Sequence, residues 1–186
     1  MPTEEERCAE AKKFQRIDDA FRKGDLDALR AAVDDPALVP NGPMPLTIGS
    51  CLVYAIYRSP LPFIRTLLDI GADPNAPADD GFPPLIAALS CVRNAPGTTP
   101  RTDVDDILRM LLSSGADPNQ RGINDYTALH MAVAERQSSA VQMLLDAGAD
   151  PQLRTRIDDY ESPLDVAQAA GLADIAAILT RAMSGA

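Results

Sequence analysis

Apolar residues along the chain follow short helical patterns that are separated by polar stretches. In four segments they recur at the three- and four-residue spacing of one helix face. These segments are 63–68, 107–112, 141–145 and 175–179. The first three are each followed by the phrase Gly-Ala-Asp-Pro with Asn or Gln, at 71–75, 115–119 and 148–152. We expect each glycine to end its helix in a left-handed conformation, and the proline to keep the helix from resuming.

A second pattern predicts another helix ahead of each of these segments. An apolar anchor residue opens this first helix, and an alanine always follows three residues later. The anchors are Ile17, Leu52, Leu85, Leu129 and Leu164, at steps of 35, 33, 44 and 35 residues. Self-similarity at this period predicts five stacked helix–turn–helix units. We place the repeats at about 9–40, 41–75, 76–119, 120–152 and 153–183, between tails at 1–8 and 184–186.

These motifs resemble the ankyrin repeat over residues 9–183. The residues that carry the resemblance are Thr127-Ala128-Leu129-His130-Met131-Ala132, the Leu-Leu pairs that close the second helices, and the Gly-Ala-Asp phrases. The resemblance implies an all-α helix–turn–helix repeat solenoid with short β-hairpin or loop connections. It also implies that His130 braces neighbouring repeats by hydrogen bonds, and that the chain is a non-catalytic scaffold that binds other proteins.

The 44-residue step contains 11 extra residues, which alignment of the second helices places at 92–102. This insertion widens the turn between the two helices of the third repeat. Arg93 and Arg101 are its only charged residues, so we consider them as possible loop contacts to a partner. The alternative is that the insertion is a surface loop without a role in binding.

The charge of the chain argues against a nucleic-acid partner. The formal net charge is −10, and no cluster of Lys and Arg is larger than a pair. Another protein with a basic or mixed-charge surface is the more natural partner; alternatively, the acidic surface only maintains solubility.

The chain shows no signal-peptide core and no apolar run long enough to cross a membrane, and its three cysteines form no Cys-x-x-Cys pair. We therefore expect a cytoplasmic protein without a membrane partner, and an effector delivered by a non-classical route stays open. With one histidine and no phosphate-binding or nucleophile motif, we expect no catalytic residue, no metal and no cofactor.

The candidate partner-binding residues lie in the connections between repeats, where the resemblance implies hairpin tips and the concave edge. Three residues before successive anchors stand Phe82, Tyr126 and Glu161; five or six before them stand Asp79 and Asp80, Ile123 and Asn124, and Asp158 and Asp159. Tyr57, on the first helix of the second repeat, extends the same surface. We predict aromatic anchors with an acidic rim, suited to a basic partner. The alternative is that Phe82 and Tyr126 only cover repeat junctions.

Two other functional classes stay open. One is an assembly or regulatory subunit of a larger complex, or a self-associating protein, although we expect a monomer or weak dimer. The other is an atypical enzyme or small-molecule binder, with aspartates near His130 as its chemistry.

Overall fold

The computed structural model describes residues 3–42, 50–77, 81–92, 100–157 and 160–184. The described residues form ten α-helices and two short 3-10 turns. The helices are α1 (Glu4–Lys23), α2 (Leu26–Ala32), α3 (Cys51–Arg58), α4 (Leu61–Asp69), α5 (Pro84–Ser90), α6 (Val104–Ser113), α7 (Ala128–Ala134), α8 (Ser138–Asp146), α9 (Pro163–Ala169) and α10 (Ala173–Met183); the turns are η1 (Pro36–Leu38) and η2 (Ile123–Asp125). Five consecutive helix pairs result, which confirms the predicted all-α repeat solenoid.

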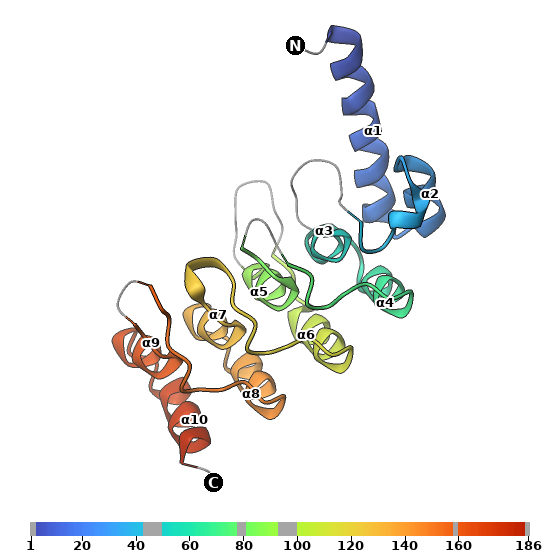
Figure 1. Cartoon of the computed structure of the whole chain (residues 1–186). Helices are drawn as coiled ribbons and strands as arrows, with labels where there is room; N and C mark the ends of the chain where they lie inside the picture. The colour runs from blue at the N-terminus through green and yellow to red at the C-terminus, as the bar shows by residue number, and fades with distance from the viewer. Residues whose placement is uncertain (1–2, 43–49, 78–80, 93–99, 158–159, 185–186) are drawn as a thin grey trace.

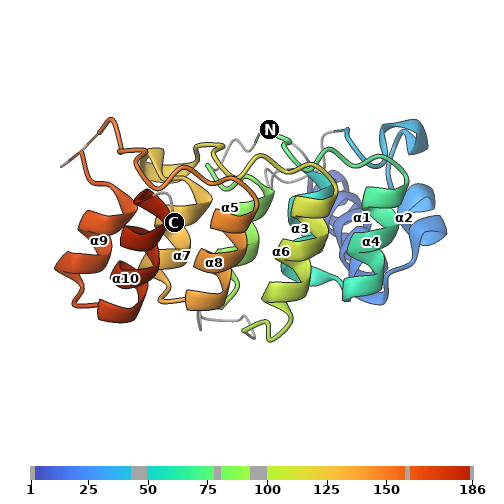
Figure 2. The ribbon, with the colours of Figure 1, turned by 90° about the horizontal axis from the view of Figure 1, so that it is seen from below.

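The helices form two layers (Figure 1). The first helices α3, α5, α7 and α9 pack side by side in one layer, and the second helices α4, α6, α8 and α10 pack in the other. Figure 2 shows that the connections between successive pairs gather on one edge of the stack, while the turns within pairs lie on the opposite edge. Of the predicted hairpins, the described residues contain an isolated antiparallel bridge between Arg121 and Thr127, and no β-strand.

We name three of these connections as fingers, each by the number of the helix pair that it precedes. Finger three comprises 75–77 and 81–83, finger four comprises 119–127, and finger five comprises 152–157 and 160–162. Together they make the finger edge.

The glycines of the repeated phrase end the second helices as predicted. Gly71, Gly115 and Gly148 have φ of 92°, 91° and 91°, a left-handed conformation that glycine adopts without steric cost. The alanine after each glycine then donates its N–H back into the last turn of the helix, for example from Ala72 to the Leu67 carbonyl at 2.9 Å.

Buried alanines allow the first helices to approach closely. Ala55, Ala88, Ala132 and Ala167, each three residues after an anchor, are fully buried. Three of the corresponding anchors, Leu52, Leu85 and Leu129, are also buried, whereas Leu164 in the last pair is half-buried. The buried side chains of successive helix pairs join into one continuous and mostly aliphatic core that runs along the stack.

A ladder of asparagines fixes the register of neighbouring connections. The side chains of Asn41, Asn75 and Asn119 each donate to the glycine carbonyl of the next Gly-Ala-Asp phrase and accept from the aspartate N–H of that phrase. Asn75, for example, lies 2.9 Å from the Gly115 carbonyl and 2.6 Å from the Asp117 nitrogen. Each Gly-Ala-Asp phrase therefore ends its own helix. It also orients the preceding connection by binding the asparagine of that connection.

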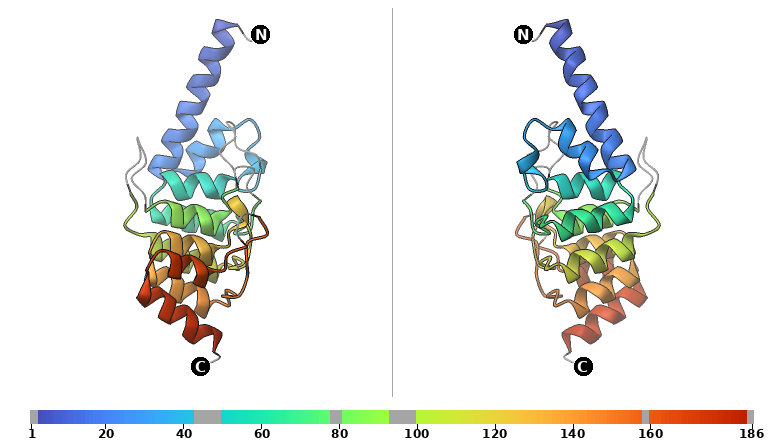
Figure 3. Two further views of the ribbon diagram at one scale, coloured as in Figure 1. Left: turned by 90° about the vertical axis from the view of Figure 1, so that its left-hand side faces the viewer. Right: turned by 90° about the vertical axis from the view of Figure 1, so that its right-hand side faces the viewer.

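The first helix differs from what the sequence predicted. α1 has 20 residues and begins at Glu4, so that residues 4–8, which we assigned to a tail, are helical. Thr3 and Glu6 form a capping box at its start, and three glutamates in the first turn favour the positive end of the helix dipole. Its N-terminal half projects beyond the stack (Figure 3).

Candidate functional site

Fingers four and five hold the densest polar network of the finger edge. In finger four, the N–H of Gly122 donates to the Tyr126 carbonyl at 2.8 Å and closes a tight turn. Asn124 and Asp125 occupy this turn with φ of 53° and 59°, a conformation that these two residue types adopt more readily than others. The turn aims the Asp125 carboxylate at finger five.

Asp125 joins the two fingers. Its carboxylate accepts hydrogen bonds from the backbone N–H of Arg156 at 2.6 Å, from the Arg156 guanidinium at 2.6–3.2 Å, and from Arg121 at 2.6 Å. The hydrogen bond from the Arg156 side chain lowers the pKa of Asp125 to about 2, against the opposing effect of burial. Asp125 therefore remains ionised at any pH near neutrality and serves the contact between fingers.

His130 makes a second link between the same two repeats. The imidazole is fully buried; Thr127 hydroxyl and amide groups contact its Nδ1 at 2.9 and 3.2 Å, and its Nε2 lies 3.1 Å from the Glu161 carbonyl. Burial lowers the pKa of His130, so that the neutral ring accepts at Nδ1 and donates from Nε2. The Tyr126 ring stacks on it, with centroids 5.3 Å apart. His130 thus braces neighbouring repeats.

Hydrogen bonds also hold the base of finger five. Thr155 and Glu161 exchange two of them: the Thr155 N–H donates to the Glu161 carbonyl at 3.0 Å, and the Glu161 N–H to the Thr155 hydroxyl at 3.1 Å. The Arg154 guanidinium donates to the Tyr160 carbonyl and to Asp165, both at 2.8 Å.

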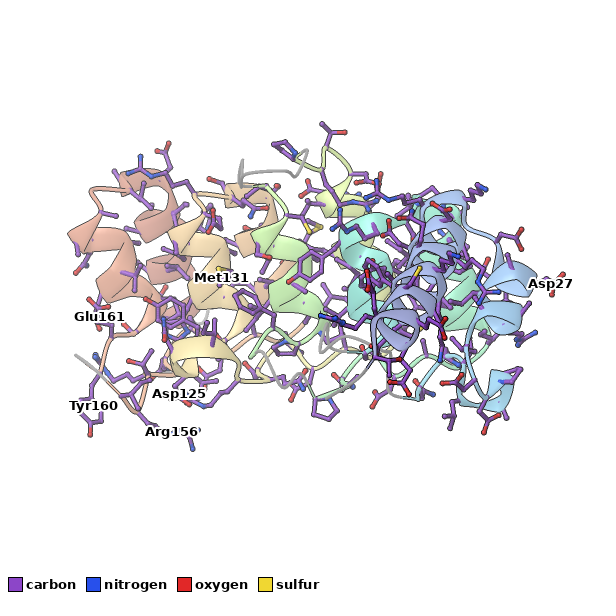
Figure 4. All side chains as sticks on the ribbon, turned by 90° about the horizontal axis from the view of Figure 1, so that it is seen from above. Asp27, Asp125, Met131, Arg156, Tyr160 and Glu161 are labelled. Carbon is purple, nitrogen blue, oxygen red and sulfur yellow. The ribbon has the colours of Figure 1, made fainter. Side chains whose placement is uncertain are left out.

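Above this base the finger presents two apolar side chains to solvent. Ile157 is 47% exposed, and Tyr160 is 61% exposed with φ of 54°. Figure 4 shows Tyr160 and Arg156 at the outer border of the finger edge, pointing away from the helices.

The structure brings some of the predicted binding residues together. Phe82, Ile123 and Tyr126 are half-buried on fingers three and four, and Asn124 is exposed at the turn of finger four. The Ile123 N–H donates to the Gly81 carbonyl at 2.5 Å, which joins these two fingers. Asp79, Asp80, Asp158, Asp159 and Arg93 lie outside the described residues.

Two other predicted residues, Tyr57 and Glu161, have different surroundings. Tyr57 lies in the last turn of α3, a helix that begins at the finger edge, so the structure separates Tyr57 from the fingers. Glu161 is half-buried, and its backbone serves the contacts with His130 and Thr155.

Arg101 has an internal role in place of the predicted contact to a partner. Its guanidinium pairs with both carboxylate oxygens of Asp103 at 2.7 and 2.8 Å. It also donates to the carbonyls of Ile56 and Ser59 at 3.0 and 2.7 Å, which caps the end of α3. Its side chain is only 14% exposed. Arg101 therefore ties the inserted segment to the preceding repeat, which leaves little of its guanidinium for a partner.

Tyr160 is absent from the predicted binding residues, although the sequence contains the signal for it. Residues 123–126 read Ile-Asn-Asp-Tyr and residues 157–160 read Ile-Asp-Asp-Tyr. Tyr126 stands three residues before its anchor, and Tyr160 stands four before Leu164. Finger five thus has one extra residue, and strict counting from the anchor selected Glu161 instead of the equivalent tyrosine.

Comparison with known proteins agrees with this architecture. A family model described as ankyrin repeats (3 copies) matches residues 52–155 and 101–185, which together cover well over half of the chain. The chain belongs to the ankyrin repeat family. Ankyrin repeats are generally protein-interaction modules, which agrees with the coarse function that the sequence predicted; the number of repeats stays a prediction.

A curated relative is similar to part of the chain. The chain is 39% identical over 77 residues to glycerophosphocholine phosphodiesterase gde1 of Schizosaccharomyces pombe. This stretch is 41% of the chain but only 7% of the phosphodiesterase. The similarity therefore concerns a small part of that protein and does not carry its activity to this chain.

Proposed function

We propose that this ankyrin-repeat chain is a non-catalytic interaction module that binds a partner protein through its finger edge and the adjoining layer of first helices. The observation that carries the proposal is a series of aromatic side chains on three successive fingers, Phe82, Tyr126 and Tyr160, of which the last is mostly exposed. Aromatic side chains inside a polar rim are the usual anchors of protein–protein interfaces.

The partner that this surface fits has a basic or mixed-charge surface. The chain carries a net charge of −10. The arginines of fingers four and five already pair with Asp125 and Asp165 within the chain. Electrostatic attraction between such an acidic chain and a basic partner accelerates association and orients the encounter.

The surroundings of His130 favour a binding role over catalysis. It is the only histidine of the chain, and it is fully buried with both ring nitrogens within hydrogen-bond distance of other groups in the chain. A general base must reach a proton on a substrate, and this ring is already used to hold finger five. In the described parts of the chain, no helix has both the length and the apolar composition that a membrane span requires.

A capture experiment tests the proposal. The full-length chain and its variant Phe82→Ala/Tyr126→Ala are immobilised and exposed to extract of the source cells. We expect a protein that the wild type retains and the variant loses. Arg109→Ala on α6 is the matched control, because Arg109 is exposed on the layer of second helices.

Urea unfolding of each protein accompanies the capture. Phe82 and Tyr126 are both half-buried, and Tyr126 also stacks on His130, so the double variant should lose about 2–3 kcal/mol of stability but remain folded. Equal retention by the folded variant and the wild type would contradict the proposal.

A further inference from the structure

We propose that the exposed N-terminal half of α1 pairs in antiparallel orientation with the same segment of a second copy of this chain and forms a weak two-fold symmetric dimer. The contact runs along one face of α1, which carries Glu5, Ala9, Lys12 and Arg16. These residues belong to none of the fingers, and the inference does not depend on the proposed function.

The first half of α1 makes little contact with the rest of the described chain. The helix has 20 residues, and its buried residues begin only at Ile17. Residues 4–12 are all exposed, and this half projects beyond the stack (Figure 3). A short helical segment that is exposed on all sides is marginal in water, so packing against another molecule would stabilise it.

A shallow groove follows one face of this half. It is lined by Ala9, Lys12, Gln15 and Arg16. Glu5 lies on the same face, one turn before Ala9, because residues three and four apart are neighbours on a helix surface. The face thus has an acidic end and a basic end. Its centre is the small side chain of Ala9, over which a second helix can approach closely.

The charges of this face are not used within the described chain. Lys13, beside the groove, pairs with Asp34 on the rest of the first repeat. By contrast, Glu5, Lys12 and Arg16 form no ion pair among the described residues. All three are exposed, so their charges are available to another molecule.

The face is complementary to itself only in antiparallel orientation. Its residues are spaced by four, three and four positions, a pattern that reads the same in both directions. Antiparallel pairing therefore places Glu5 of one copy beside Arg16 of the other, and Ala9 beside Lys12. Parallel pairing would oppose like charges. Because a two-fold interface uses the same patch on both subunits, this self-complementarity specifies a second copy as the occupant.

The dimer should be weak and sensitive to salt. From residue 5 to residue 16 the helix is about 17 Å long, which is too short for a standard interface of about 1,600 Å². Exposed ion pairs contribute little individually and are screened by salt. We expect a dissociation constant on the order of 10–100 µM at low salt, and at least about fivefold higher in about 0.5 M NaCl.

Sedimentation equilibrium of the full-length chain tests the inference. The variants Glu5→Lys/Glu6→Lys and Lys12→Glu/Arg16→Glu each repel a second copy of themselves, so we expect each to be monomeric. An equal mixture of the two, with one labelled by a fluorophore, should form heterodimers, because their charges are opposite along the whole face. The control Arg65→Glu should dimerise like the wild type, since Arg65 is exposed on α4.

Cysteine crosslinking tests which face of α1 is used. Cys8, which is exposed, is first replaced by serine. A cysteine is then placed at Ala9 or at Ala11, and a short bis-maleimide is added. Both alanines are exposed, but they lie about 200° apart around the helix. We expect crosslinked dimers from Ala9→Cys and few from Ala11→Cys. Circular dichroism verifies that every variant is folded.

Three results would overturn the inference. One is a wild-type chain that stays monomeric at low salt up to about 500 µM, well above the expected dissociation constant. Another is a dimer that both charge-reversed variants form as strongly as the wild type. The third is equal crosslinking from positions 9 and 11. The capture of a partner by the finger edge would be unaffected by any of them.

Discussion

The two ends of the stack use similar residue types for different purposes. Between α1 and α3, Phe21 packs edge-on against Tyr54 with centroids 4.6 Å apart, and Asp18 accepts hydrogen bonds from Tyr54 at 2.7 Å and Arg22 at 2.6 Å. Between fingers four and five, Tyr126 stacks on His130, and Asp125 binds Arg121 and Arg156. We call the first cluster the α1–α3 junction.

Burial distinguishes the two regions. Phe21, Tyr54 and Asp18 are all buried between helices. At the fingers the Arg156 side chain is 71% exposed and Tyr160 is 61% exposed. A buried aromatic group beside a satisfied carboxylate stabilises the fold, whereas the same groups on a loop leave surface for recognition. We therefore expect substitutions at the α1–α3 junction to change stability and substitutions at finger five to change binding.

The largest effect should come from Phe21→Ala. Phe21 is completely buried and contacts both Tyr54 and Phe63, so its removal leaves a cavity between the first two helix pairs. Loss of a buried phenylalanine costs about 3–5 kcal/mol of unfolding free energy. Urea unfolding followed by circular dichroism measures it; a loss below about 1 kcal/mol would show that this junction is not central to stability.

Tyr54→Phe should have the next largest effect. The substitution keeps the ring against Phe21 but removes the hydrogen bond to the buried Asp18 carboxylate. A hydrogen bond to a charged group contributes about 1.5–3 kcal/mol. The same urea experiment should show a loss in this range, and an unchanged midpoint would contradict the role assigned to this bond.

The acid sensitivity of the junction should depend on Asp18. Burial opposes ionisation of Asp18, but hydrogen bonds from Tyr54 and Arg22 outweigh it and lower the pKa of this carboxyl group. Because the folded pKa lies below the unfolded value of about 4, the contribution of Asp18 is complete above that pH and is lost as the pH falls through the folded pKa. As the pH falls below about 4, the free energy of unfolding should therefore decrease less for Asp18→Asn than for the wild type. Parallel plots of this free energy against pH would refute the prediction.

Asp125→Asn should have a local effect on the fingers. It weakens the contacts to Arg156 and Arg121 without removing core packing. We expect hydrogen exchange at the Arg156 amide, which donates to Asp125, to accelerate several-fold, while exchange in α1 and α3 stays unchanged. Equal acceleration throughout the chain would mean that the contacts of Asp125 with Arg156 and Arg121 support the whole fold.

The smallest effect on stability should come from Tyr160→Asn. The ring is mostly exposed, and asparagine accepts the positive φ at this position. The free energy of unfolding should change by less than about 0.5 kcal/mol. A greater loss would mean that Tyr160 supports finger five rather than a partner.

Local signals in the sequence predicted the parts of the structure that repeat. The glycines at 71, 115 and 148 end helices, and the alanine phase marks where first helices approach, because each feature depends on a few neighbouring residues. The length of α1 was also encoded locally, in the capping box of Thr3 and Glu6.

The candidate site was harder to predict because its residues do not keep the repeat phase. One extra residue moves Tyr160 out of register with Tyr126, although the motif around it is intact. Arg101 binds the Ile56 carbonyl, 45 residues away, and Asp125 binds Arg156, 31 residues away. These contacts depend on how neighbouring repeats pack, which local sequence patterns do not reveal.

Hydrogen–deuterium exchange of the full-length chain, with and without the partner captured from extract, tests the division of roles most directly. We predict that binding slows exchange in residues 121–127 and 154–162 and leaves residues 17–23 of α1 and 61–69 of α4 unchanged. Protection centred on the α1–α3 junction or on the layer of second helices, with finger five unaffected, would contradict the assignment of recognition to the finger edge.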